Sequence, residues 1–468
     1  MRGSEHISRR GFLKGTGLAA LAAACGTGGE PGVEDTGAAP APTQTEPTQR
    51  LSGDLRILLW SHFVPRHDEW FDTFAQDWGR DVGVNVTVDH INNAEIPGRI
   101  AAEIGASEGH DLIQYIATLS QFEPSVIDLT DLVSEAENRH GEMLPLCRRS
   151  SFNPTTEKFY AYAPGWVPDP GDYRKSLWEK AGLAAGPTTW DELLQGGAAI
   201  KRDQNVQMGI GLSQEIDSNM AARALIWSFG GSIQDDNENV VLNSDQVVEA
   251  TDFMARLFRE TMTDEVFAWN AASNNQGLIA GQLSYILNSI SAWRTAQEAN
   301  PDVAKDVFFV KALEGPSTAL AAQHVMYNWI VPDHSANPDA AQEFLLHYTA
   351  NFSQATFESK LYDFPAFPET VPELEDWLDD DPFAIEGDDP KKLVVLKDAV
   401  DWSTNIGHPG PANPAVGEIF NTFVISNMLA RVAREEQSSA DSVAEAEREC
   451  EAIFDGWRQR GLIGGGSA

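Results

Sequence analysis

Cysteine is scarce in this sequence, with 3 residues among 468, which is too few for a fold held together by disulfides. Basic residues are also few. The chain has 33 lysines and arginines against 70 aspartates and glutamates, and its formal net charge is −37. A field of this sign repels nucleic acids and anionic lipid surfaces. We therefore expect no nucleic-acid partner, and we interpret the charge as an aid to solubility outside the cell.

The apolar run near the N-terminus, residues 18–24, is too short to span a bilayer. It follows Arg9 and Arg10 and ends at Cys25, an order typical of an export signal. The stretch "SRRGFLK" (8–14) resembles the twin-arginine export motif, and "AAAC" (22–25) resembles a lipoprotein box in which leucine stands one place early. We expect residues 1–25 to be a signal. Cys25 then either carries a lipid anchor or is removed by simple cleavage.

Residues 26–51 are rich in glycine, proline and threonine and contain little to bury, so we expect a flexible stalk. We expect a disordered tail at 463–468. If Cys25 is lipidated, Cys147 and Cys450 remain as a candidate disulfide pair. The sequence alone leaves that bridge open.

From residue 52 the chain alternates short apolar runs with helical patterns and shows no internal repeat. Strands are predicted at 54–60, 84–91 and 111–116, and helices at 65–78 and 96–109. Alternation of this kind predicts an α/β fold with a mainly parallel sheet flanked by helices. Ligands of such sheets bind beyond the carboxyl ends of the strands, which directs attention to the loop that begins at Trp60.

Two features that suggest metal sites have simpler interpretations. His62 and His67 are not at the spacing of helical zinc ligands, and no carboxylate stands with them in the H-E-x-x-H arrangement. The acidic run 235–238 lacks the glycine of a calcium loop, so a hairpin turn is predicted there. We expect neither a metal nor a cofactor.

A longer segment, 159–201, contains "AGL" (181–183) and "PTTWDEL" (187–193). Thr189 is suited to cap the helix that follows, with acidic residues in its first turn. These motifs resemble the family 1 extracellular solute-binding proteins that serve ATP-binding-cassette (ABC) importers. The resemblance continues in order through 226–254, 274–293, 328–349 and 413–454, although 281–285 departs from the family pattern at its small and methionine positions.

The resemblance implies a type II periplasmic-binding-protein-like fold, with two α/β lobes joined by a hinge and one ligand held between them. We place the first lobe at 52–163 plus 312–370 and the second at 164–311 plus 371–462. The protein is expected to be a monomer. Its closed form is expected to dock on the membrane permease subunits of an importer, with the lipid anchor as its only membrane attachment.

A sugar or polyol is the expected small-molecule ligand. A sugar ring offers an apolar face that stacks on aromatic rings and an edge of hydroxyls that pairs with polar side chains. The chain has 13 tryptophans, and several fall where the pattern predicts loops. The predicted ligand-binding residues are Trp60, His62, Trp166, Asp169, Arg174, Trp227, Asn288, Ser289, Trp293, Trp402 and His408.

Three alternatives stay open at this point. A cationic solute such as a polyamine would exploit the acidic chain and an aromatic box. A secreted glycoside hydrolase would need a carboxylate pair, but nothing marks one, and the G-x-S-x-G and H-E-x-x-H motifs are absent. A surface adhesion protein should show repeats. The charged segment 376–392 is interpreted as a solvated loop.

Overall fold

The computed structural model describes residues 39–41, 43 and 51–465. The predicted signal, Cys25, nearly all of the stalk and the last three residues lie outside this range, so those predictions stay untested. Among the described residues, no helix has both the length and the apolar character needed to cross a membrane.

The first sheet is built from the predicted N-terminal strands. Strand β1 (Gly53–Trp60) runs parallel to β2 (Val84–Ile91) along its whole length and parallel to β3 (Leu112–Tyr115) on its other side, while β13 (Asn328–Ile330) adds antiparallel to β3. Its helices include α1 (Pro65–Val82), α2 (Ile96–Ala106), α3 (Thr130–His140), α12 (Pro338–Ala350) and α13 (Phe352–Glu358). The strand–helix–strand–helix–strand prediction is confirmed.

Helix α1 shows how the sequence determines this part. Pro65 stands in its first turn, where a proline costs no hydrogen bond. Phe71, Phe74 and Trp78 are buried on one stripe and pack against the aromatic ring of Phe344 in α12. The helix ends at Gly83, whose φ of 87° is the left-handed conformation that glycine adopts readily.

The second sheet has the order β10-β7-β9-β8. Strand β7 (Gly171–Arg174) is antiparallel to both β10 (Val307–Val310) and β9 (Leu283–Leu287), whereas β8 (Gln207–Gly209) is parallel to β9. Mainly parallel pairing therefore holds for the first sheet alone, whereas the second sheet is mixed. Its helices are α5 (Lys175–Lys180), α6 (Trp190–Gln204), α7 (Ile216–Ser228), α8 (Asp245–Thr261), α9 (Ser273–Ile279), α10 (Ser291–Ala299) and α11 (Pro301–Asp306).

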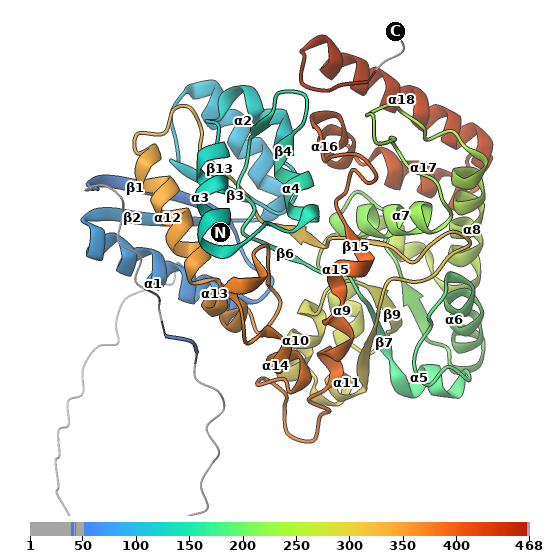
Figure 1. The fold of residues 1–468 in the computed structure, drawn as a ribbon. Helices are drawn as coiled ribbons and strands as arrows, with labels where there is room; N and C mark the ends of the chain where they lie inside the picture. The colour runs from blue at the N-terminus through green and yellow to red at the C-terminus, as the bar shows by residue number, and fades with distance from the viewer. Residues whose placement is uncertain (1–38, 42, 44–50, 466–468) are drawn as a thin grey trace, which may run out of the picture. The chain divides into compact units, whose positions relative to one another are not determined.

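Short strands carry the chain between the two sheets. Strand β6 (Gly165–Val167) pairs antiparallel with both β12 (Val325–Met326) and β14 (Phe364–Pro365). A second small pair joins β11 (Ala321–Ala322) to β15 (Ser403–Thr404). In Figure 1, β6 and β15 lie between the elements of the first sheet and those of the second. The crossings agree with a hinge, and the exact lobe limits stay a prediction.

The C-terminal helices return to the second sheet's helices. Helices α17 (Val424–Ala433) and α18 (Ser439–Gln459) both pack on α8, and α16 (Pro414–Asn421) packs on α18. Figure 1 shows these late helices beside the green helices of the middle of the chain. The remaining helices and strands are α4 (Pro145–Ser151), α14 (Leu374–Asp379), α15 (Ala399–Trp402), β4 (Phe152–Asn153) and β5 (Lys158–Phe159). The 3-10 turns are η1 (Asn93–Glu95), η2 (Ser120–Ser125), η3 (Asp264–Ala268), η4 (Pro368–Thr370) and η5 (Lys392–Leu396).

Three local predictions concern the cap of α6, the turn at 235–238 and the candidate disulfide. Thr189 caps α6 by accepting from the backbone N–H of Glu192, as predicted. The acidic run at 235–238 forms the predicted hairpin turn, closed by a bridge between Gln234 and Val240. Cys147 and Cys450 are both buried and free, so the candidate disulfide does not form.

The segment 376–392 is not the solvated loop that was predicted. Asp381 is buried against Arg294 of α10, with guanidinium–carboxylate distances of 2.7 and 3.0 Å. The ammonium of Lys392 lies 2.6 Å from a carboxylate oxygen of Asp388, and both side chains are buried. The correction has a physical reason, because charged residues are buried when each finds a partner of opposite sign.

Candidate ligand-binding cleft

A cavity of about 470 Å³ lies at the carboxyl ends of β1, β2 and β3, where the rule for parallel sheets places ligands. We call it the cleft. One wall comes from the loops after these strands and the other from the start of α7, the turn before α9 and the junction of α16 with α17. The lining residues are Phe63, Asn92, Asn93, Ala94, Tyr115, Ile116, Gln214, Glu215, Ile216, Asn270, Ala271, Ala272, Phe420, Asn421 and Phe423.

The lining combines aromatic rings with side-chain amides. Phe63, Tyr115, Phe420 and Phe423 supply flat apolar faces, and five of the other lining residues carry amides. The hydroxyl of Tyr115 donates to the amide oxygen of Asn421 at 3.4 Å, so this contact joins the two walls. Rings that stack and amides that pair with hydroxyls are the groups that a neutral polyhydroxylated ligand requires.

Phe423 has an unusual backbone. Helix α16 ends at its C-cap Thr422 and α17 begins at Val424, so Phe423 alone makes the turn between them with a φ of 59°. The left-handed region is strained for a bulky side chain, and such strain is concentrated at functional sites. The sharp turn leaves Phe423 in the wall of the cleft.

Acidic side chains lie behind the cleft wall. Glu215 lines the cleft and caps α7, accepting from the backbone N–H groups of Asp217 at 2.7 Å and Ser218 at 2.5 Å. Asp217 accepts from the amide of Asn274 at 2.8 Å. The Nδ1 atom of His324 lies 2.9 Å from a carboxylate oxygen of Asp169 and 3.8 Å from one of Asp217.

Burial controls the ionisation of this group. It raises the pKa of Asp169 and Glu215, and it raises the pKa of Asp172 and Asp217 well above the ordinary value, with the nearby negative charges adding to the effect on these last two. Both carboxyl oxygens of Asp172 lack a hydrogen-bond partner among the described residues. The four carboxyls therefore favour a proton or a cationic group nearby. We call Asp169, Asp172, Glu215 and Asp217 the acidic cluster.

Some of the sequence-predicted site residues lie near the cleft and the acidic cluster. Trp60, at the end of β1, is buried with its ring 4.9 Å from that of His62 and 5.0 Å from that of Phe63. Asp169 belongs to the acidic cluster. Asn288 donates to the amide oxygen of Asn275 at 2.7 Å, and the hydroxyl of its neighbour Ser289 is buried without a partner.

The other predicted residues lie elsewhere. Trp166 is fully buried on a second cavity of about 270 Å³ beside Phe364. Each of the rest contacts a structural neighbour: Arg174 pairs with Asp306 at 2.7 Å, Trp227 packs edge-on against His408, Trp293 packs against Phe309, and Trp402 donates to Asp398 at 3.1 Å. None of the eleven predicted residues is among those lining the cleft. Their contact with a ligand stays a prediction.

Sequence reasoning missed the aromatic residues that do line the cleft. Phe63 follows the first strand and Tyr115 ends the third, so the carboxyl-end rule pointed to both positions. Phe420 and Phe423 carried no comparable signal, because they lie in the predicted closing helices far along the chain. The sequence predicts stacking on tryptophan, whereas the rings that line the cleft belong to three phenylalanines and one tyrosine.

Comparison with known proteins identifies the family. Residues 65–354 match the sequence profile of the bacterial extracellular solute-binding proteins. The chain belongs to this family. The solute-binding protein thus has the fold class that its sequence predicted. Because the family is one of solute-binding transport receptors, the hydrolase and adhesion alternatives are set aside.

Curated relatives cover only part of the chain. A protein of Brucella abortus (strain 2308) that is named as a binding protein is 26% identical over 175 residues, which is 37% of this chain and 42% of the relative. A Brucella suis biovar 1 (strain 1330) protein named in the same way gives the same values. The match thus spans less than half the length of these curated relatives.

Solved structures share the fold over most of both chains. The maltose-bound MalE3 of T. maritima has a TM-score of 0.70 and 18% identity, covering 86% of this chain and 100% of that chain. A sugar transporter of Arthrobacter chlorophenolicus A6 with bound laminaribiose has a TM-score of 0.71 and 16% identity, covering 86% and 99%. A solute-binding protein of Agrobacterium radiobacter K84 in complex with ribitol has 0.69 and 17%, covering 87% and 100%. The two-lobe fold is therefore the fold of this protein.

Proposed function

We propose that this solute-binding protein captures a sugar or polyol in the cleft and delivers it to the permease of an ABC importer. The observation that carries the proposal is the cleft itself, with its aromatic rings and amides at the carboxyl ends of three parallel strands. Neighbours with the same fold were solved with maltose, laminaribiose and ribitol. Aromatic faces and hydrogen-bonding amides suit ligands of this chemistry.

The mechanism follows from the two walls. A ligand that touches both walls binds the closed form better than the open form and shifts the population toward closure. The closed form then docks on the permease. Twin-arginine export and a lipid on Cys25 would hold the protein at the outer side of the membrane, where a stalk of about 26 residues keeps it at high effective concentration near that partner.

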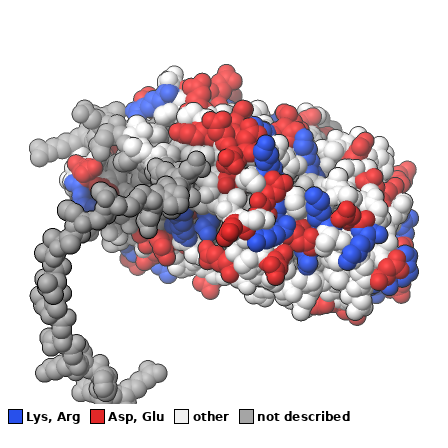
Figure 2. Space-filling view, turned by 90° about the horizontal axis from the view of Figure 1, so that it is seen from below, with Lys and Arg blue, Asp and Glu red and all other residues white. Residues whose placement is uncertain are grey.

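The charge distribution of the surface is unfavourable for binding a nucleic acid. Figure 2 shows acidic side chains spread over one face with basic side chains between them, and no extended basic area is visible on the described part of that face. With a formal net charge of −37, long-range electrostatics oppose binding to a polyanion. A monomer with one cleft is the expected working unit.

A thermal-shift screen tests the proposal, because a ligand that binds only the native state raises the melting temperature. The probes are maltose, laminaribiose, ribitol and a panel of other oligosaccharides and polyols. We expect at least one of them to raise the midpoint in a concentration-dependent manner. A panel that leaves the midpoint unchanged, with every sugar and polyol at millimolar concentration, would contradict the proposal.

The acidic cluster favours a second candidate, a cationic solute such as a polyamine. Asp169, Asp172, Glu215 and Asp217 are buried near the cleft, and none of them pairs with a lysine or arginine of the described chain. A ligand ammonium group would compensate such charges. Including spermidine in the same screen separates the two candidates. A midpoint that rises with spermidine and falls back with added salt, while no sugar has an effect, would favour the cationic ligand.

A further inference from the structure

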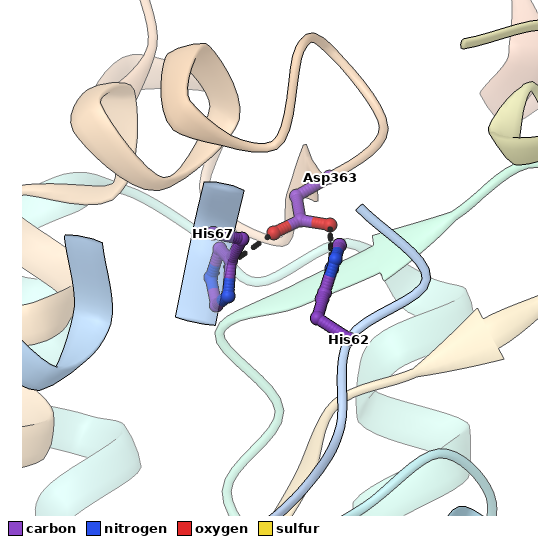
Figure 3. A group of neighbouring side chains, drawn as sticks. All are labelled: His62, His67 and Asp363. Atoms are coloured by element: carbon purple, nitrogen blue, oxygen red, sulfur yellow. Dashed lines mark hydrogen bonds and ion pairs between the residues drawn. The ribbon is translucent and has the colours of Figure 1, made fainter. Parts of the chain in front are cut away.

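Two histidines and a carboxylate meet next to the first wall of the cleft. His62 follows β1, His67 lies in the first turns of α1, and Asp363 immediately precedes β14. The Nε2 atom of His62 lies 3.1 Å from one oxygen of Asp363, and the Nε2 atom of His67 lies 3.5 Å from the other. Figure 3 shows the carboxylate between the two imidazoles. One ligand atom from each residue fits within 4.8 Å of the others.

These side chains are buried and incompletely satisfied. Both ring nitrogens of His67 and the Oδ2 atom of Asp363 have no hydrogen-bond partner within the described chain. The side chain of Asp363 is fully buried and forms ion pairs only with the two histidines among the described residues. A buried carboxylate without a compensating positive charge is costly. The arrangement therefore calls for a cation.

We propose that His62, His67 and Asp363 bind a Zn²⁺ ion. Imidazole nitrogens and a carboxylate oxygen are the ligands that zinc takes from proteins. The hydroxyl of Tyr327 lies 3.2 Å from His62 Nε2 and 2.5 Å from Asp363 Oδ1, so this hydroxyl or a water molecule would complete a tetrahedral set.

The surroundings of the two rings differ. A metal-binding histidine usually donates its second ring N–H to a carbonyl or a carboxylate, which fixes the tautomer and the ring orientation. The Nδ1 atom of His62 is held by the backbone of Val64, whose N–H donates to it at 2.9 Å and whose carbonyl oxygen lies 3.1 Å away. The Nδ1 atom of His67 has no hydrogen-bond partner among the described residues, and the nearest carboxylate oxygen of Asp68 lies 3.8 Å away.

The donor atoms lie slightly farther apart than the ligand atoms of a zinc-bound site. Zinc bonds of about 2.0–2.2 Å place the corners of a tetrahedral site about 3.4 Å apart, compared with the upper limit of 4.8 Å here. The two imidazoles approach different oxygens of Asp363, at 3.1 and 3.5 Å, so the carboxylate already lies near the ligand spacing from each ring.

A metal here would have a consequence for the cleft. Phe63 lies in the cleft wall between His62 and Val64, and the ion would tie its loop to the crossing segment that carries Asp363. The role is structural, since it fixes an aromatic wall and supplies no chemistry. The sequence predicts no metal because the two histidines lack the H-E-x-x-H arrangement of helical zinc ligands. The fold brings Asp363 from 301 positions beyond His62.

The test is zinc titration of the purified protein after removal of metals with a chelator. We expect about one Zn²⁺ per chain by elemental analysis, a higher melting temperature with zinc, and the visible absorption of tetrahedral Co²⁺ when cobalt replaces zinc. His67→Gln and Asp363→Asn should each weaken zinc binding by at least about tenfold. Asp363→Asn is nearly isosteric and decides the matter if His67→Gln does not fold.

The matched control is His90→Gln. His90 is a partly exposed histidine whose ring nitrogens lie 2.8 Å from Asp72 and 3.5 Å from Asp68, an arrangement that could bind zinc adventitiously at the surface. We expect this variant to keep the stoichiometry and affinity of the wild type. Absence of zinc binding, zinc binding that survives in both cluster variants, or zinc binding lost in His90→Gln would each overturn the proposal.

Discussion

The imidazole of His324 joins two carboxylates from different parts of the chain. Its Nδ1 atom lies 2.9 Å from Asp169, which precedes β7, and 3.8 Å from Asp217, in the first turn of α7. The ring of Phe63 lies 6.4 Å from that of His324, so this contact also reaches the cleft wall. A single side chain on a crossing segment therefore contacts both sides of the binding region.

The acidic cluster should make stability depend on pH in a characteristic direction. Burial, followed by the charges of Asp169 and Asp217, raises the pKa of Asp172 in the folded protein. The folded state then binds more protons than the unfolded state, so the contribution of Asp172 to the free energy of unfolding falls as pH rises from about 4, by up to about 1.4 kcal/mol per pH unit.

Replacing Asp172 by Asn removes this contribution. The variant should gain stability relative to the wild type as pH rises from about 4 toward neutrality, measured by urea unfolding at several pH values. Glu192→Gln serves as a control of opposite sign: Glu192 is partly exposed and hydrogen bonds from Thr188 lower the pKa of its carboxyl, so this variant should lose stability relative to the wild type as pH rises. A difference between Asp172→Asn and the wild type that is constant with pH would show that Asp172 titrates normally.

Alanine substitutions at Phe63 and Trp293 distinguish a ligand-contacting residue from a core-packing residue. Phe63 is partly exposed and lines the cleft, so Phe63→Ala should weaken the binding of any sugar found in the screen by about tenfold, equivalent to about 1.4 kcal/mol. Trp293 is fully buried against Phe309, so Trp293→Ala should lower the free energy of unfolding by about 3–5 kcal/mol. Calorimetric titration and urea unfolding measure the two effects.

The reverse pattern would change the site assignment. If Phe63→Ala leaves affinity unchanged while Trp293→Ala folds with wild-type stability and no longer binds, the original expectation for Trp293 would be right. The cleft described above would then be a surface feature without ligand.

The predicted first sheet was correct because each of its elements has a local cause. The strand ending at Trp60 closes on the apolar run 57–60, and the helix beginning at Pro65 carries its buried residues at helical spacing. Such patterns involve neighbours along the chain, so one sequence contains them completely. Thr189 and its helix are a further case, since a cap depends on residues three positions apart.

The site was harder to predict because its contacts join distant segments. Asp363 meets His62 across 301 positions, and Tyr115 meets Asn421 across 306. No periodicity in a single sequence records such pairs. Composition does not resolve the site either: an abundance of tryptophan suggests a ligand-stacking role, the five predicted tryptophans are all buried, and their contact with a ligand stays a prediction. Asp381 shows the same limit, because its partner Arg294 lies 87 positions away.

The two cysteines predict a specific pattern of thiol reactivity. Both are buried and free, burial raises the pKa of Cys147 well above its ordinary value, and burial raises the pKa of Cys450 to about 12. Because the thiolate is the reactive form, neither thiol should react with Ellman's reagent in the native protein at pH 8, and both should react in urea without a reductant. Protein that yields neither thiol in urea would show that the bridge does form.

The Arg294–Asp381 pair should be among the most sensitive contacts of the fold. The guanidinium makes two bonds to the carboxylate at 2.7 and 3.0 Å, and both side chains are almost fully buried. Removing one partner of a buried pair leaves an uncompensated charge, which typically costs about 3–5 kcal/mol. Asp381→Asn should therefore lower the free energy of unfolding by that order, as measured by urea unfolding at neutral pH.

Arg202 and Asp203 provide the control for that pair. They also form a bidentate guanidinium–carboxylate contact, at 2.7 and 2.6 Å, but at a fully exposed position. Solvent screens an exposed pair, so Asp203→Asn should leave the unfolding curve unchanged. Equal effects of Asp381→Asn and Asp203→Asn would mean that the segment 376–392 is solvated after all. A large loss confined to Asp381→Asn would instead establish that this charged segment is anchored to α10 by its one buried carboxylate–guanidinium contact.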